Sequence, residues 1–277
     1  MSRRELASLL KDAYLSWDRH NAQTMGASLA YFTVLSLAPL LVVAVAIAGL
    51  VFGRQAAQGI VVDQIRDQVG ISAAQVIQNI LVHARSPSAG ILASTLGFGT
   101  LLFGAAGVFT ELRSALNRIW DVPPTPFGWK SLLTDQLRSF ALVLGAGFLL
   151  LASLVLSAVL SAAKGFLSSL WIASALSSWI VVLLLFALLY RLVPAARIPW
   201  SDVWIGAAAA SVLFTLGKHL VAMYLTKASV GSAYGAAGSL VLLLVWVYYS
   251  AQIFLFGAEF TRVYAGREGS RRMPRVV

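Results

Sequence analysis

Three charged residues at the margins of long apolar stretches could do chemistry inside a membrane: Glu111, Lys218 and Glu259. A charge at the centre of a bilayer costs about 2.5–3.5 kcal/mol on insertion scales, so such residues are candidates for function. Either carboxylate could couple transport to a proton gradient by changing its protonation, and the lysine could hold a phosphate or carboxylate group. Structural roles compete with these interpretations. Glu259 could form a buried ion pair with Arg138 or Arg262, and the lysine amine could reach the interface.

Small and polar residues form rows along single faces of the predicted helices, and we call such a row a seam. The longest seam recurs at alternating intervals of three and four, which places its members on one face of a helix. They are Gly97, Thr100, Gly104, Gly107, Glu111, Ser114 and Arg118. Such a seam can line a cavity, or it can pack closely against a neighbouring helix.

Two further apolar stretches carry a polar face. In the first, Pro39 is expected to kink the helix whose polar face holds Tyr31 and Ser36. In the last, Tyr248 and Gln252 share a face with the glutamate near its end. The predicted substrate or coupling path comprises Tyr31, Ser36, Pro39, Thr100, Glu111, Lys218, Tyr248, Gln252 and Glu259.

The elements that hold these residues follow from where charges are missing. Only 12% of the 277 residues are charged, about half the usual share for a soluble domain, and 59% are hydrophobic. About 20 apolar residues are needed for a helix to cross the hydrocarbon core of a bilayer. We therefore predict an all-α polytopic membrane protein with six transmembrane helices, near residues 28–52, 90–112, 139–163, 168–192, 203–226 and 235–260.

The distribution of positive charge predicts an orientation. On a six-span layout, 15 of the 21 Lys and Arg residues fall on the side that holds both termini, which places the termini in the cytoplasm. Residues 1–27 are predicted to form a cytoplasmic amphipathic helix, lying on the inner leaflet or docked on the bundle. Residues 28–262 are predicted to form the transmembrane domain, with an outer-face helical hairpin over 54–89 between spans 1 and 2. Residues 263–277 are predicted to form a basic cytoplasmic tail.

Several functional classes are disfavoured. The chain has no cysteine, which excludes thiolate metal sites and cysteine nucleophiles. It has no P-loop, and its three histidines lie in different segments without an acidic cluster at ligand spacing. We therefore expect no enzyme activity, no metal and no cofactor. The net charge of +10 is explained by topology rather than by nucleic-acid binding, so membrane lipids are the expected partners. Protein partners and a homo-oligomer stay open.

Several stretches resemble the YihY/BrkB family of bacterial inner-membrane proteins, historically labelled ribonuclease BN. They are ASLAYFTVLSLAP at 27–39, ELRSALNRIW at 111–120, YGAAGS at 234–239, WVYYSAQ at 246–252 and GAE at 257–259. The resemblance implies a six-helix inner-membrane protein linked to envelope properties such as lipopolysaccharide or lipid export. It implies no catalytic residues.

The leading hypothesis is a transporter or translocation factor for an anionic, amphipathic, lipid-like envelope substrate. The alternative is a membrane scaffold or assembly factor for envelope machinery, in which the polar seams are packed shut. A membrane-bound nuclease is a third hypothesis, and it would require activity in protein free of contaminating nucleases.

Overall fold

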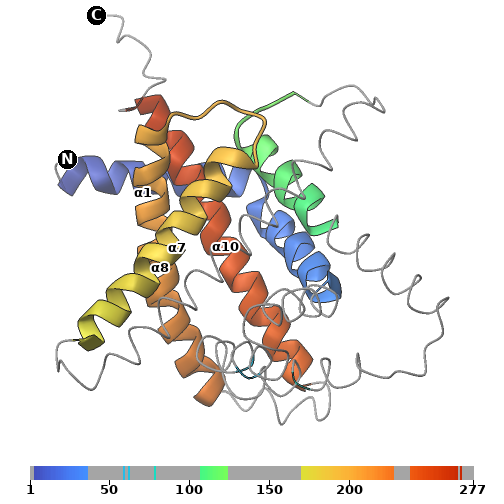
Figure 1. Cartoon of the computed structure of the whole chain (residues 1–277). Coiled ribbons are helices and arrows are strands. Elements are labelled where there is room, and N and C mark those ends of the chain that lie inside the picture. Colours follow the sequence, from blue (N-terminus) through green and yellow to red (C-terminus); the bar gives the residue numbers. More distant parts are fainter. Residues whose placement is uncertain are drawn as a thin grey trace, which may run out of the picture. The chain divides into compact units, whose positions relative to one another are not determined.

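The described part of the computed structural model is helical (Figure 1). It comprises residues 3–36, 107–123, 170–227, 238–267 and 269, with the single residues 59, 62 and 78. Its helices are α1 (Arg3–Arg19), 22–36, 107–119, α7 (Leu170–Leu192), α8 (Trp200–Lys227) and α10 (Gly238–Arg267). The predicted span at 139–163, residues 37–52 and 90–106 of the predicted spans near 28–52 and 90–112, nearly all of the predicted hairpin and most of the predicted tail lie outside the described residues.

Two of the described helices are long and apolar enough to cross a membrane. They are α8, over Trp200–Gly217, and α10, over Leu240–Arg267, while α7 contributes a shorter apolar run at Trp179–Leu192. The predicted spans 168–192, 203–226 and 235–260 fall on these three helices. Helix α10 continues beyond residue 260, where the predicted span ends. Charged residues mark the end of a predicted membrane span, but they do not interrupt the backbone hydrogen bonds of the helix.

Contacts divide the chain into two compact units. Unit 1 comprises Met1–Met25, Leu112–Thr215 and Gln252–Val277, and unit 2 comprises Gly26–Glu111 and Leu216–Ala251. Each unit is therefore assembled from segments that are far apart in the sequence.

The core of unit 1 is an aromatic cluster on α7, α8 and α10. Phe186 packs edge-on against Phe214 and Phe254, with ring centroids 5.7 and 5.9 Å apart. Tyr190 packs against Phe254 at 5.0 Å, and its buried hydroxyl donates a 2.7 Å hydrogen bond to the Phe254 carbonyl. This bond satisfies the one polar group of the cluster, as burial of a tyrosine requires.

Replacing Tyr190 by phenylalanine is expected to lower the free energy of unfolding by about 0.5–1.5 kcal/mol, because it removes one buried hydrogen bond and little packing. Detergent-induced unfolding of the purified protein measures this change. Tyr14→Phe is the matched control, since the Tyr14 ring is 56% exposed. An equal loss of stability in both variants would contradict the role of the buried hydroxyl.

Small residues bring α8 and α10 together within unit 1. A Cβ at Gly206 would lie 2.7 Å from the Cβ of Thr261, and a Cβ at Gly257 would lie 2.6 Å from the Cβ of Ala210. The Thr261 hydroxyl donates a 2.7 Å hydrogen bond to the Gly257 carbonyl, so it adds no unpaired polar group to the contact. This is the small-residue packing by which membrane helices approach closely.

Unit 2 shows the same close packing. A Cβ at Gly107 would lie 3.0 Å from the Phe32 ring, and a Cβ at Gly217 would lie 2.6 Å from the Tyr249 ring. Gly107, a member of the longest predicted seam, therefore packs against helix 22–36. The other glycines of that seam lie outside the described residues.

Candidate functional site

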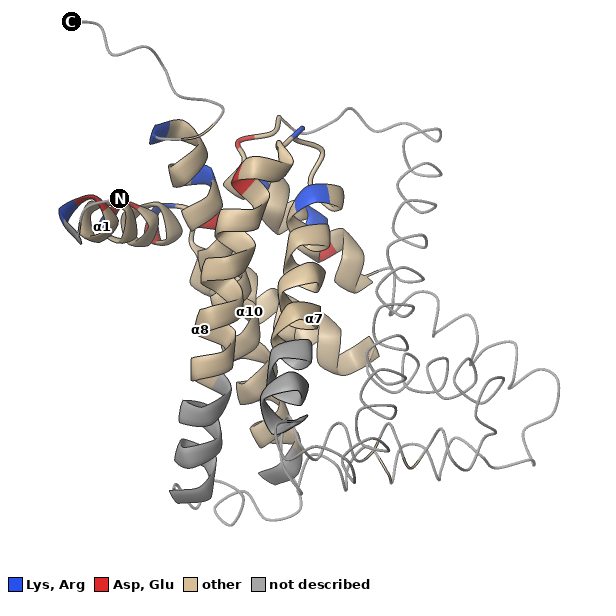
Figure 2. Cartoon of the chain, turned by 60° about the vertical axis from the view of Figure 1, so that its left-hand side comes forward, with Lys and Arg blue, Asp and Glu red and all other residues tan. Residues whose placement is uncertain are grey.

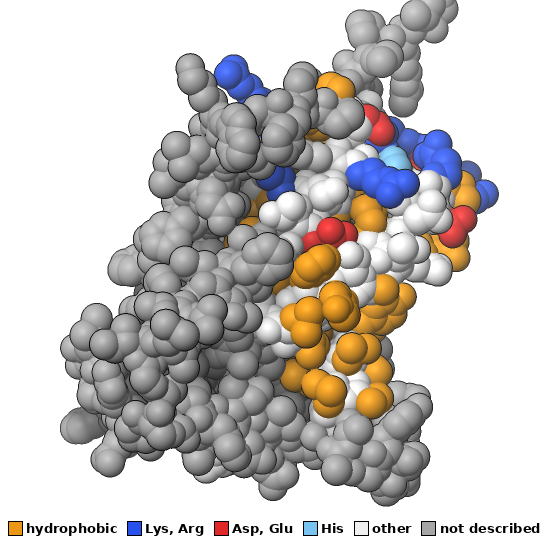
Figure 3. Space-filling model, turned by 90° about the vertical axis from the view of Figure 1, so that its right-hand side faces the viewer, with side chains coloured by type: hydrophobic (Ala, Val, Ile, Leu, Met, Phe, Trp, Pro, Cys, Tyr) orange, Lys and Arg blue, Asp and Glu red, His pale blue; other side chains and the backbone are white. Residues whose placement is uncertain are grey.

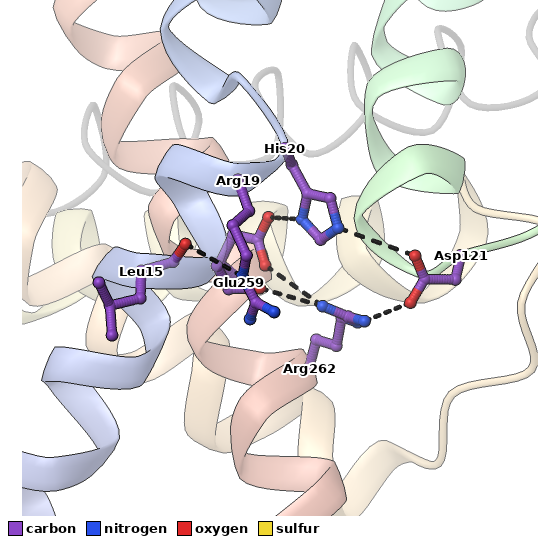
Figure 4. A network of polar contacts seen from close by, with 7 residues as sticks. Leu15, Arg19, His20, Asp121, Glu259 and Arg262 are labelled. Carbon is purple, nitrogen blue, oxygen red and sulfur yellow. Dashed lines mark hydrogen bonds and ion pairs between the residues drawn. The ribbon is translucent and has the colours of Figure 1, made fainter.

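The candidate site lies where three segments of unit 1 meet, and the end of α1 supplies the first of them. The His20 amide donates a 3.0 Å hydrogen bond to the Ser16 carbonyl, and the chain then turns at Asn21 into helix 22–36. Asn21 has a φ of 53°, in the left-handed region that asparagine tolerates better than most residues. This turn carries the His20 side chain onto α10 (Figure 4).

The second segment is the end of helix 107–119. Asp121 has a φ of 50°, and the Val122 amide donates a 2.9 Å hydrogen bond back to the Asn117 carbonyl. This is the pattern of a left-handed helix cap. The Asn117 side chain accepts a 2.8 Å hydrogen bond from the Ala195 amide, which fixes the cap to the connection between α7 and α8.

The third segment is α10, which carries the buried carboxylate of Glu259. This side chain is 0% exposed, and its Oε1 lies 2.5 Å from His20 Nδ1. Its Oε2 accepts no hydrogen bond from the described residues. Arg262 Nη1, 4.0 Å from Oε2, is the nearby cation of an i, i+3 pair. Glu259 is thus a buried carboxylate whose Oε1 contacts His20 and whose Oε2, among the described residues, has only the longer ion pair with Arg262.

Arg262 joins all three segments. Its guanidinium forms an ion pair with Asp121, donates a 3.0 Å hydrogen bond to the Ser16 hydroxyl and lies near the buried carboxylate (Figure 4). His20 Nε2 lies 3.7 Å from Asp121 Oδ1, so the imidazole bridges the two carboxylates. We call His20, Asp121, Glu259 and Arg262 the carboxylate network.

The carboxylate network sets one permanent cation, Arg262, against the two carboxyl groups of Asp121 and Glu259, with the His20 imidazole in contact with both. Acidic residues and histidines in contact near membrane helices are the combination of side chains that proton relays use.

Gln252, two turns before the buried glutamate on α10, contacts the same turn of the chain. Its Nε2 lies 3.4 Å from the Ala22 carbonyl and 3.3 Å from the Gln23 carbonyl, while its Oε1 is buried without a partner among the described residues. Gln252 and Glu259 therefore face the segment 20–23 together, and each has one buried oxygen without a hydrogen bond from the described part of the chain.

The other predicted path residues are not brought into this network. Ser36 is buried, with its hydroxyl bonded to the Thr33 carbonyl at 3.1 Å. Tyr31 is exposed, and Glu111 and Tyr248 are half-buried. Pro39, Thr100 and the Lys218 side chain lie outside the described residues. Within the described part, no group of three His, Asp or Glu residues could hold a metal ion.

Sequence reasoning missed two members of the carboxylate network. His20 lies 239 residues before Glu259, and Asp121 lies 141 residues before Arg262. No periodicity encodes such contacts. Arg262 was one of the two arginines proposed as the counter-ion of Glu259, and it lies at ion-pair distance; Arg138 lies outside the described residues.

With this geometry in place, comparison with known proteins places the chain in a family. A family model described as Virulence factor BrkB matches residues 13–275. The chain belongs to the BrkB family. This confirms the resemblance seen in the sequence, and the chain is a membrane protein of this family.

Individual BrkB relatives carry names of two kinds. UPF0761 membrane proteins of Verminephrobacter eiseniae and Kangiella koreensis are 32% and 24% identical, over 88% and 91% of this chain. The chain spans only 60% and 62% of the length of these two relatives. A ribonuclease-like protein of Bacillus subtilis, YfkH, is 26% identical over 94% of this chain and 96% of its own length. No solved structure matches the chain.

Proposed function

We propose that this BrkB-family chain is a transporter or translocation factor of the bacterial inner membrane that moves an anionic, amphipathic, lipid-like envelope substrate, with Glu259 as the coupling carboxylate. The observation that carries the proposal is the fully buried Glu259, with Oε1 on His20 and with Oε2 receiving no hydrogen bond from the described residues. A buried carboxylate is costly unless it is paired, and proton relays are a common use of such groups in membrane helices. No chemical reaction is assigned to the chain.

Contacts within unit 1 support the placement of four segments of the chain on the same side of the membrane. The end of α1, the cap at Asp121, the connection between α7 and α8 and the end of α10 contact one another. Most of the Lys, Arg, Asp and Glu residues coloured in the ribbon lie toward this end (Figure 2). On the face shown in Figure 3, the charged side chains likewise gather toward one end and hydrophobic side chains cover the surface below them. The proposal places this end in the cytoplasm, because the sequence carries its excess of Lys and Arg there.

The test is lipid movement in proteoliposomes. We expect the purified protein to accelerate the movement of a fluorescent phosphatidylglycerol between leaflets, read by dithionite quenching, and to respond to an imposed pH gradient. Glu259→Gln should lose the response to the gradient. Asp12→Asn is the control, because Asp12 pairs with Arg267 at the exposed edge of α1 and such pairs contribute little.

The outcomes separate two functions. Lipid movement equal to that in empty vesicles would overturn the proposed transport and favour a membrane scaffold. In a scaffold, the carboxylate network would serve only to hold its three segments together. An unchanged gradient response in Glu259→Gln would remove the coupling role and leave transport itself standing.

A further inference from the structure

Helix α1 has three distinct faces. At about 100° per residue, Leu9, Ala13 and Ser16 share one face, and all three are buried. A second face holds most of the charged residues of the helix. The third face is apolar and exposed, and a soluble helix packed on a bundle would not need it.

The buried face fixes α1 against α10. Leu9 and Ala13 form a core cluster with Phe260 of α10, and Ala209 of α8 packs against this cluster. Arg267, at the end of α10, forms an ion pair with Asp12. The apolar contacts hold α1 against α8 and the end of α10 (Figures 1 and 2), and the exposed ion pair adds little to them.

The exposed apolar face carries large side chains at intervals of four. Leu6, Leu10 and Tyr14 are 45%, 41% and 56% exposed, and the Tyr14 ring stacks on Trp17 with centroids 5.8 Å apart. Lys11 lies at the border of this face, where its amine can reach lipid headgroups while its stem packs along apolar surface. We call the exposed Leu6, Leu10 and Tyr14, together with the half-buried Trp17 beside them, the α1 apolar face.

The depth of α1 along α8 indicates what covers this face. Trp200 and Trp204, both exposed, begin α8 with the Arg191 guanidinium 5.9 Å from the Trp200 ring, which is the composition of a membrane interface. Ala209 lies five residues beyond Trp204, about 7.5 Å further along the helix axis. The contact with α1 is therefore on the apolar side of these tryptophans.

We propose that the α1 apolar face docks into the headgroup boundary of the phospholipid bilayer, continuous with the lipid-facing surface of α8. An interfacial helix buries its apolar face about 5–10 Å into this boundary and keeps its charged face in water. The inference is independent of transport, since a membrane scaffold would need the same contact between α1 and the bilayer surface.

Single cysteines test the proposal, because the chain has none of its own. Leu10→Cys and Leu15→Cys are a matched pair: both leucines are on α1, with similar exposure of 41% and 46%, but Leu15 lies among the charged residues. Each variant is labelled with an environment-sensitive dye and reconstituted in vesicles of phosphatidylethanolamine and phosphatidylglycerol. The dye at 10 should lose fluorescence with doxyl-labelled lipid and resist aqueous iodide, and the dye at 15 should do the reverse.

Two results would overturn the proposal. Quenching of both dyes by iodide alone would show a helix in water. Protection of the dye at 10 from both quenchers would show that a protein partner or a second copy of the chain covers the face.

Discussion

Replacing His20 by alanine is expected to lower the free energy of unfolding by about 2–4 kcal/mol, because it leaves the Glu259 carboxylate buried without its hydrogen-bond partner. Arg262, at 4.0 Å and without a hydrogen bond to Glu259, replaces only part of that interaction. Detergent-induced unfolding of the purified variant measures the loss. Asp121→Asn is the control, since Asp121 is 63% exposed and its pairs should be worth less than about 1 kcal/mol.

A double variant separates a lost bond from an orphaned charge. In His20→Ala/Glu259→Leu both partners are apolar, and removing both is far less costly than removing one. We expect the double variant to recover most of the stability that His20→Ala loses. If the double variant is less stable than His20→Ala, the stability that His20→Ala loses does not come from the unpaired Glu259 carboxylate. That result would contradict the role of His20 as the partner of the buried charge.

The same double variant distinguishes the two proposed functions. A scaffold needs the three segments held together, so a stable double variant should keep its function. A proton-coupled transporter needs the carboxylate itself, so the stable double variant should lose the response to a pH gradient. Stability and coupling thus become separate measurements on one protein.

Among the described helices, long apolar runs predicted the helical segments from the sequence. The predicted span at 168–192 agrees as a helix with α7 at Leu170–Leu192, and α8 and α10 are the two described helices that are long and apolar enough to cross a membrane. Helix ends were less accurate: α10 continues to Arg267, seven residues beyond the predicted 260, because hydropathy changes at the interface while the helix does not. The turn at His20 and Asn21 divides the predicted N-terminal segment 1–27 into α1 and the start of helix 22–36, which the hydropathy pattern did not indicate.

The candidate site was predictable only in part. A carboxylate at the margin of an apolar run requires a counter-ion, and Arg262 was close enough in sequence to name. His20 was not, because two helix caps and the packing of α1 on α10 bring it to Glu259. The hydropathy pattern shows that Glu259 lies at the margin of an apolar helix, where a charge needs a partner. Which residue provides that partner depends on the tertiary structure, and it cannot be read from the pattern.

Enlarging Gly257 is expected to disrupt the packing of α7, α8 and α10. A Cβ there would lie 2.6 Å from the Ala210 Cβ and 3.3 Å from Tyr190 Cζ, so Gly257→Ala should lower the free energy of unfolding by about 1–3 kcal/mol, and Gly257→Leu should prevent folding. Gly266→Ala is the matched control on α10: nothing lies within 4 Å of its Cβ position, so stability should hold or rise with helix propensity. Adding Ala210→Gly to Gly257→Ala returns space at the contact and should recover part of the loss. Equal thermal unfolding of the alanine variants at 257 and 266 would contradict the close approach of α8 and α10, and with it the frame that holds Glu259 against His20.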